Sequence, residues 1–145
     1  MSKLRVEHIK SFKEYRLYID ELRPKLRAIE SAVELYLWDY YYWYISLEDW
    51  GKVFEDVLLN QPKYVSDKFD CEDFAMLTTA RVLEKYRLNT CGVVVGQSPF
   101  GEHGYNLFIA RVDDKAELFI LEPQDGMIYP VTEPEGYKPR IIILG

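Results

Sequence analysis

The sequence predicts an α+β fold in which N-terminal helices are followed by a cysteine-bearing helix that packs on a C-terminal antiparallel sheet. Apolar residues recur every three to four positions as far as Tyr86, which is typical of amphipathic helices. From Cys91 onward the period changes to that of strands. With 145 residues, 48% of them hydrophobic and 29% charged, the chain has the size and composition of one globular domain. We expect a single domain over 1–145, with a helical N-terminal extension (1–45) and a core (46–145).

Two helices are expected in the N-terminal extension. Ser11 and Glu14 have the spacing of a capping box, and Pro24 should end or kink the helix that follows them. A second helix should run from about Lys25 into the forties, on an apolar series formed by Leu26, Ile29, Val33, Leu37 and Tyr40.

Two further helices are expected in the core. Ser46 is the N-cap of the third, whose apolar stripe is Trp50, Val53, Phe54, Val57 and Leu58. Asp70 is the N-cap of the fourth, which should extend to about Tyr86 and place Cys71 in its first turn. Strands are then expected near 91–95, 105–112, 117–121, 127–131 and 140–144, with a hairpin turn at 113–115.

An aromatic stretch interrupts the ordinary composition of the N-terminal extension at 36–44, where seven of nine residues are Tyr or Trp. A helix here would carry rings on every side and would be either wholly buried or partly covered by something else. Core packing is the plainer interpretation. Because Tyr and Trp suit contact surfaces with one wet end, these helices could also form a partner surface or a homodimer contact.

Charge and composition exclude several classes of function. A net charge of −6 and a pI near 5.0 argue against nucleic-acid binding, which normally needs a basic stripe. We expect no membrane association, because no apolar run is long enough to span a bilayer, and a cytoplasmic location, because Lys3, Arg5 and His8 interrupt any secretory segment. Cys71 and Cys91 form no disulfide framework and lack zinc-ligand spacing, so neither a metal nor a cofactor is expected.

Cys71 is the first candidate for chemistry. The N–H groups and partial positive charge of a helix N-terminus favour thiolate over thiol, and the same N–H groups can stabilise an oxyanion. Asp70, Glu72 and Asp73 have the opposite effect, because acidic neighbours raise the pKa of a thiol. Their structural interpretation is that they cap the helix and complement its dipole.

A base and an orienting group follow later in the chain. His103 lies between two glycines at the start of a predicted strand, whereas His8 lies in the charged N-terminus. A tight turn at 113–114 would make Glu122 a diagonal neighbour of His103, and a longer turn would instead bring Asp125 opposite it. We favour Glu122 because the strand itself holds it, while Gln124 remains a neutral alternative.

These three places resemble the papain-like and transglutaminase-like thiol hydrolases. The run Asp70-Cys71-Glu72-Asp73-Phe74-Ala75 resembles the nucleophile helix of their small members, Gly101 to Asn106 resembles their histidine strand, and Glu122 to Gln124 resembles the strand end with the third residue. The C-terminal protease domain of a mushroom agglutinin is similar in the same places. The resemblance covers roughly 46–131 and implies a thiol-hydrolase-like core with Cys71 as nucleophile, His103 as base and Glu122 as orienter. Gln61 and Tyr64 are candidates for the side-chain oxyanion donor that the family often adds.

The sequence therefore predicts a cysteine-dependent hydrolase, a peptidase or amidase that acts on a peptide or protein through an acyl-thioester. Transfer of the acyl group to an amine cannot be distinguished from hydrolysis. The alternative is a catalytically silent papain-like fold that serves as a binding or assembly module through its aromatic helix.

Overall fold

The computed structural model describes residues 11–145, and His8 with the rest of the charged N-terminus lies outside them. Within this range the first elements are β1 (Tyr15–Tyr18), α1 (Ile19–Ile29), β2 (Glu34–Leu37), β3 (Tyr41–Ser46), α2 (Leu47–Val57) and α3 (Cys71–Tyr86). The remaining elements are β4 (Cys91–Ser98), β5 (Gly101–Val112), β6 (Lys115–Glu122), β7 (Met127–Pro130) and β8 (Lys138–Leu144).

The strands form one mixed sheet. Its main path runs β1-β3-β5-β4-β8-β2. Outside this path, β6 pairs with β5, and β7 pairs with β6. Most neighbours are antiparallel, but β2 pairs with β8 and β3 with β5 in parallel. The N-terminal strands thus join strands from the far end of the chain, and the sheet cannot be divided into a separate C-terminal unit.

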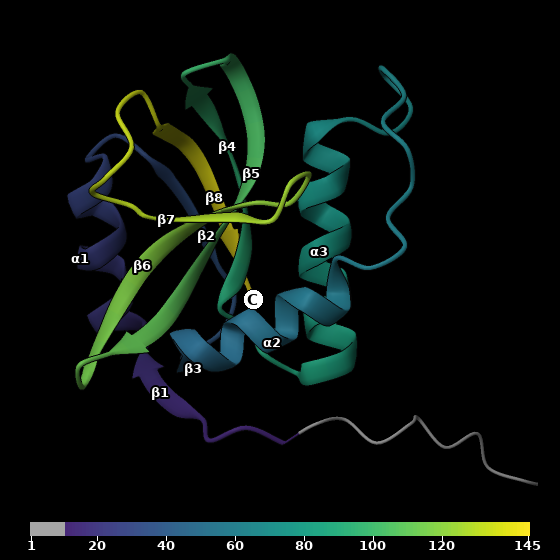
Figure 1. The fold of residues 1–145 in the computed structure, drawn as a ribbon. Coiled ribbons are helices and arrows are strands. Elements are labelled where there is room, and N and C mark those ends of the chain that lie inside the picture. Colours follow the sequence, from purple (N-terminus) through teal and green to yellow (C-terminus); the bar gives the residue numbers. More distant parts are fainter. Residues whose placement is uncertain (1–10) are drawn as a thin grey trace, which may run out of the picture.

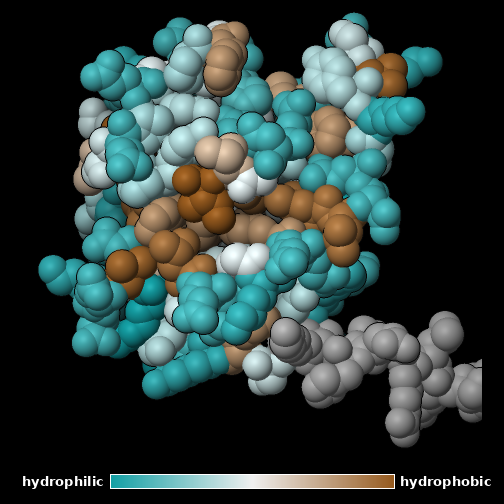
Figure 2. Space-filling view, in the orientation of Figure 1, coloured by the Kyte–Doolittle hydropathy of each residue, from teal (hydrophilic) through white to brown (hydrophobic). Residues whose placement is uncertain are grey.

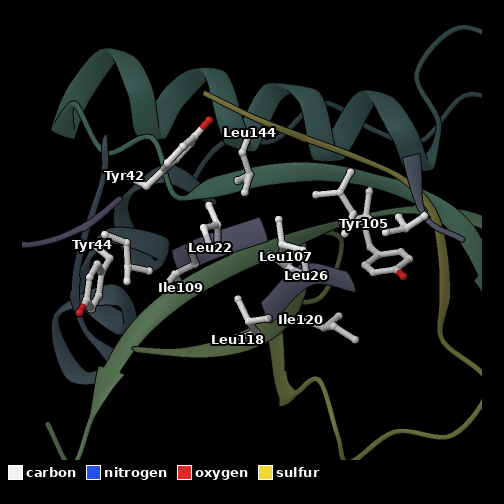
Figure 3. Packing of buried hydrophobic residues seen from close by; sticks show 14 residues of the cluster. Leu22, Leu26, Tyr42, Tyr44, Tyr105, Leu107, Ile109, Leu118, Ile120 and Leu144 are labelled. Carbon is white, nitrogen blue, oxygen red and sulfur yellow. The ribbon is translucent and has the colours of Figure 1, made fainter. Parts of the chain in front are cut away.

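Helices cover both faces of the sheet. Figure 1 shows α1 on one side and α2 with α3 on the other. The side chains of β5 and β6 alternate between the two faces, so that Leu107 and Ile109 contact the α1 cluster while Phe108 and Ala110 contact the cluster under α2 and α3. Figure 3 shows the first cluster, in which Leu22 and Leu26 of α1 meet the strand residues. Because both faces of β5 are buried, its sequence is a continuous apolar run rather than a strict alternation.

The expected core elements are confirmed in position. Ser46 Oγ accepts a hydrogen bond from the N–H of Asp49 at 3.1 Å and begins α2, whose buried stripe includes Trp50, Val53, Phe54 and Val57. Asp70 precedes α3, and its N–H donates to Asp73 Oδ2 at 3.1 Å. The strands at 91–98, 101–112, 115–122, 127–130 and 138–144 lie where the sequence predicts strands.

The predicted fold class is wrong in residues 11–45 and in the character of the sheet. Residues 11–14 form no helix, and α1 runs through Pro24 instead of ending there. The described chain holds eight strands and three helices, and the sheet is mixed rather than antiparallel. This is a mainly β structure with a helix on one face and two on the other, not N-terminal helices followed by a helix on a sheet.

The aromatic stretch forms strands β2 and β3 rather than a helix. Along β3, Tyr42 and Tyr44 are buried in the core, while Tyr41 and Trp43 face outward. The physical reason is that aromatic side chains favour a pleated surface with one buried face, which the two-residue alternation provides. A helix at the same place would have had to bury every side.

Side chains from the segment after α3 complete the free edge of β3. The Asn89 side chain accepts from the N–H of Trp43 at 2.7 Å and donates to the carbonyl of Tyr41 at 2.9 Å. Thr90 Oγ1 donates to the carbonyl of Trp43 at 2.7 Å. These bonds fix the part of β3 that lies before its pairing with β5 begins at Ile45.

Candidate functional site

The first turn of α3 lies directly against β5. A Cβ atom on Gly104 would lie 2.6 Å from Glu72 Cα, so only glycine permits this approach. Deeper in the structure, the buried Asn106 side chain donates to the carbonyls of Ala75 and Gly92, each at 3.0 Å. It therefore joins α3, β4 and β5 and sets where the helix N-terminus lies on the sheet.

Cys71 is half-buried in this contact. Its thiol donates to Glu72 Oε2 at 3.2 Å and accepts from the Gly104 N–H at 3.3 Å. Burial raises the pKa of the thiol, the Gly104 hydrogen bond opposes that effect, and Glu72 raises the pKa further. Within residues 11–145, no hydrogen bond joins the Cys71 thiol to His103.

His103 and Glu122 meet as the two-residue turn requires. Val112 pairs with Lys115 and Asn106 with Leu121, which brings His103 Nε2 to 2.8 Å from Glu122 Oε2. Gln124 and Asp125, the alternatives, belong to the turn beyond β6, where Asp125 Oδ1 accepts from the Met127 N–H at 2.9 Å.

Tyr137 is a member of this cluster that no sequence pattern predicted. Its hydroxyl donates to Glu122 Oε1 at 2.5 Å, so both carboxylate oxygens of Glu122 are engaged. Burial, followed by the bond to Glu122, raises the pKa of Tyr137. The Tyr137 ring also packs edge-on against Tyr105, whose ring stacks on His103. No motif marks Tyr137, because only the tertiary fold brings the segment just before β8 to the end of β6.

Neither proposed oxyanion donor has a clear place in this cluster. The Gln61 side chain donates to the carbonyl of Pro123 at 2.8 Å, and Tyr64 is exposed on the loop before α3. Three carboxylates at the start of α3, those of Asp70, Glu72 and Asp73, approach one another within 4.8 Å. Capping and local hydrogen bonds account for this group.

A second candidate site lies on the outer face of the β1–β3 ribbon. Tyr18 lies opposite Tyr41 and Arg16 opposite Trp43. The exposed fractions of the three aromatic side chains are 39%, 44% and 39% for Tyr18, Tyr41 and Trp43. The Arg16 guanidinium carbon lies 4.2 Å from the Tyr41 ring centroid and 5.7 Å from that of Trp43. These four residues are called the aromatic patch below.

Two other surface features differ from the aromatic patch. A cavity of about 460 Å³ lies between α1 and β6, lined in part by Lys25, Glu117 and Tyr137. Figure 2 shows a hydrophobic band across the middle of the face, at the level of β7 in Figure 1. Neither the lining of the cavity nor β7 presents an exposed Tyr or Trp side chain.

Comparison with solved structures identifies the fold. The chain is similar to a structure described as "PSL1a-E64 complex", with 23% identity and a TM-score of 0.72 over 88% of this chain and 51% of that one. It is also similar to a Polyporus squamosus lectin bound to the human-type influenza-binding epitope Neu5Acα2-6Galβ1-4GlcNAc, with 21% identity and a TM-score of 0.65 over 88% and 49%. The chain spans about half the length of these proteins.

The family is established by sequence. Residues 42–128 match the Agglutinin C-terminal family, and because the match covers more than half of the chain, this protein belongs to that family. No curated protein matches the sequence. Among residues 11–145, no helix combines the length and the hydrophobicity that a membrane crossing requires.

These findings correct the predicted identity and function. The likeness to the C-terminal domain of an agglutinin is confirmed by the family match, whereas the wider assignment to papain-like or transglutaminase-like hydrolases is contradicted, and one similar structure is named a lectin. The predicted cysteine peptidase or amidase, which rested on that wider assignment, is contradicted as well. The expected peptide or protein substrate is not supported either. The binding-module alternative agrees better with the comparisons, although its aromatic residues lie on strands. The roles assigned to Cys71, His103 and Glu122 stay predictions.

Proposed function

We propose that this protein is a glycan-binding module and that the aromatic patch is its contact surface. The observation that carries the proposal is a set of three half-exposed rings with an arginine held between two of them on one face of a β-ribbon. A pyranose ring has an apolar C–H face and a polar rim, and Tyr and Trp offer a matching apolar body with a polar tip.

The patch is held in shape before any ligand binds. Tyr42 and Tyr44 anchor the inner face of β3 in the core, and the Asn89 side chain fixes the backbone of Tyr41 and Trp43. The rings of Tyr18 and Tyr41 lie 5.7 Å apart between centroids, so each restricts the other. A surface that is already ordered loses little conformational entropy on binding, which favours affinity for a small, polar ligand.

The comparisons support a glycan as the ligand. The family is named for agglutinins, and a structure with the same fold is a lectin solved with a sialylated trisaccharide. Because the chain spans about half of that lectin, the likeness by itself assigns no sugar site to this half. The aromatic patch is what gives this chain a surface suited to the task.

The experiment is a glycan-array screen followed by titration calorimetry with the best glycan. Tyr41→Ala and Trp43→Ala should each weaken binding about tenfold or more, a loss of about 1.4 kcal/mol or more. Phe100→Ala is the matched control, because Phe100 is 85% exposed at the tip of the β4–β5 hairpin, away from the ribbon. Absence of binding to any glycan, or unchanged binding in both patch variants, would refute the proposal.

A second copy of the chain is the competing occupant of the patch. Sedimentation velocity distinguishes it, because a homodimer through this surface would dissociate in Trp43→Ala and persist in Phe100→Ala. That outcome would assign the aromatic patch to assembly instead of glycan binding.

A further inference from the structure

We propose that the hairpin end of β6 is a docking site for an extended peptide of a partner protein, which adds to the sheet as one more strand. The peptide is held and not cleaved, and the site is separate from the aromatic patch. The starting point is that β7 covers only part of the outer edge of β6. Their pairing runs from Glu122 to Phe119 and is followed by one bond, from the Val131 N–H to the Leu118 carbonyl at 3.1 Å. In Figure 1 the end of β6 that carries the hairpin turn extends away from β7.

Backbone groups at this end of β6 point outward. Val112 pairs with Lys115 across the two-residue turn. In this register Lys115 and Glu117 direct their N–H and C=O groups toward β5, whereas Ala116 directs both of its groups to the outside. Among residues 11–145, no group accepts from the Ala116 N–H, and its carbonyl receives only the exposed Lys25 ammonium, at 3.5 Å. Outward donors and acceptors of this kind are what a strand of another chain binds. Residues 115–117 are called the open edge below.

A cavity of about 460 Å³ lies on each face of the sheet beside the open edge. On the α1 face, the side chains of Ala116 and Ala28 are small and leave room, and Ile29 supplies an apolar wall. The cavity on the opposite face is lined in part by Lys115 and Glu117. Because successive side chains of a strand point to opposite faces, an added strand would place its side chains in the two cavities in turn.

The residues of the open edge specify the sequence of the peptide. The side chain opposite Ala116 would enter the α1-face cavity and should be apolar. Its two neighbours would lie opposite Lys115 and Glu117, both exposed, and opposite charges directly across a ladder stabilise the pairing. Antiparallel addition is the direction that β7 already takes beside β6. It requires a basic, an apolar and an acidic residue, in this order from the N-terminus of the peptide.

The experiment titrates two peptides of identical composition into the full chain and follows the backbone amide signals by NMR. One is acetyl-Thr-Arg-Leu-Glu-Thr-amide, and the other has its charges exchanged, acetyl-Thr-Glu-Leu-Arg-Thr-amide. We expect the first to bind about tenfold more tightly, because two opposite-charge pairs replace two like-charge pairs across the ladder. On binding, the amide signal of Ala116 should shift and its hydrogen exchange should slow.

Two variants test the register and the cavity. Lys115→Glu combined with Glu117→Lys should reverse the preference between the peptides, and both positions are exposed, so the fold is kept. Ala28→Leu should weaken the binding of both peptides, because leucine would fill the α1-face cavity from an exposed helix position that it suits. The control exchanges an exposed ion pair outside the site, Glu102→Arg with Arg140→Glu, and should leave the preference unchanged.

Three outcomes would overturn the proposal. The first is equal binding of the two peptides, or no binding of either at about 1 mM, which corresponds to a binding free energy of only about −4 kcal/mol. The second is a preference that the double variant of the open edge leaves unchanged. The third is an Ala116 signal that moves when the protein alone is diluted, since the occupant would then be a second copy of the chain. Trp43→Ala should bind the peptides as the wild type does, so failure of the glycan-binding proposal leaves this one standing.

Discussion

Replacing Gly104 by alanine tests how closely α3 lies on the sheet. The new Cβ would lie 2.6 Å from Glu72 Cα and 2.8 Å from Glu72 N. Carbon atoms in contact are normally about 3.5–4.0 Å apart, so the first turn of α3 and β5 would have to separate by about 1 Å. Both neighbouring atoms belong to the backbone, and no rotation of a side chain can relieve the clash.

Overpacking of this kind costs about 1–3 kcal/mol, and we expect Gly104→Ala to lower the free energy of unfolding by about 2 kcal/mol. For a chain of this size, that corresponds to a fall in Tm of about 6 °C. Urea unfolding at pH 7, followed by circular dichroism, measures the change. The Cys71 thiol should also react faster with iodoacetamide, because the turn that covers it moves away from Gly104.

Gly51→Ala is the matched control for the same chemical change. Gly51 is exposed within α2, and a Cβ atom there would meet nothing within 4 Å. Because glycine in a helix is less favourable than alanine by about 0.5–1 kcal/mol, this variant should be more stable than the wild type. If Gly104→Ala were as stable as Gly51→Ala, the close approach of α3 to β5 would be disproved.

Three further predictions concern the two cysteines and two hydrogen-bonded polar side chains. Cys71 should be alkylated in the folded protein, whereas Cys91, whose pKa burial raises to about 12, should react only after unfolding; equal rates would contradict their environments. Asn106→Leu should lower the free energy of unfolding in urea by about 2 kcal/mol, and a negligible loss would show that its hydrogen bonds do not hold α3. The Tyr86 hydroxyl donates to Asp56 at 2.6 Å and is the main cause of the lowered pKa of that carboxyl. The stabilisation that a lowered carboxyl pKa represents is present above about pH 4 and is lost as the pH falls below that value. Tyr86→Phe should therefore lower the free energy of unfolding by about 1 kcal/mol at pH 7 and by little at pH 2.5. An equal loss at both pH values would contradict this prediction.

The core elements could be predicted because their signals are local. A serine cap and a four-residue apolar stripe determine α2, and both lie within twelve residues. The β5–β6 register was open because Asp113-Asp114 is not a common hairpin turn. Both residues adopt positive φ, 49° and 62°, which is what a two-residue turn of this hairpin type requires and which aspartate tolerates.

The N-terminal strands could not be predicted in the same way. The series from Leu26 to Tyr40 fits a helical period, yet the helix ends at Ile29 and the chain then pairs with β8, more than a hundred residues away. A parallel partner so distant leaves no trace in the local pattern. Within 41–46, however, the β-forming residues and the two-residue alternation of buried and exposed rings were available as a signal for a strand.

The same difference between local signals and distant partners explains which parts of the candidate sites could be predicted. The contact of His103 with Glu122 follows from a hairpin, so sequence spacing reduced the possible partners of His103 to Glu122, Gln124 and Asp125. Tyr137 was missed because it lies just before β8 and meets Glu122 only through the tertiary fold, and Arg16 was missed because only the pairing of β1 with β3 brings it to its neighbours. A motif search finds residues that lie close together in the chain, whereas the aromatic patch is formed only when β1 pairs with β3.

The Asn89 side chain works as a substitute for one peptide unit of a missing strand. It accepts from one N–H of β3 and donates to one of its carbonyls, as a neighbouring backbone would. Exposed strand edges recruit strands from other molecules and so promote aggregation. A strand whose outward side chains are solvent-exposed aromatic rings is especially prone to this kind of aggregation. The Asn89 carboxamide occupies backbone groups of β3 that a strand of another molecule would otherwise bind, while the aromatic rings of β3 stay accessible.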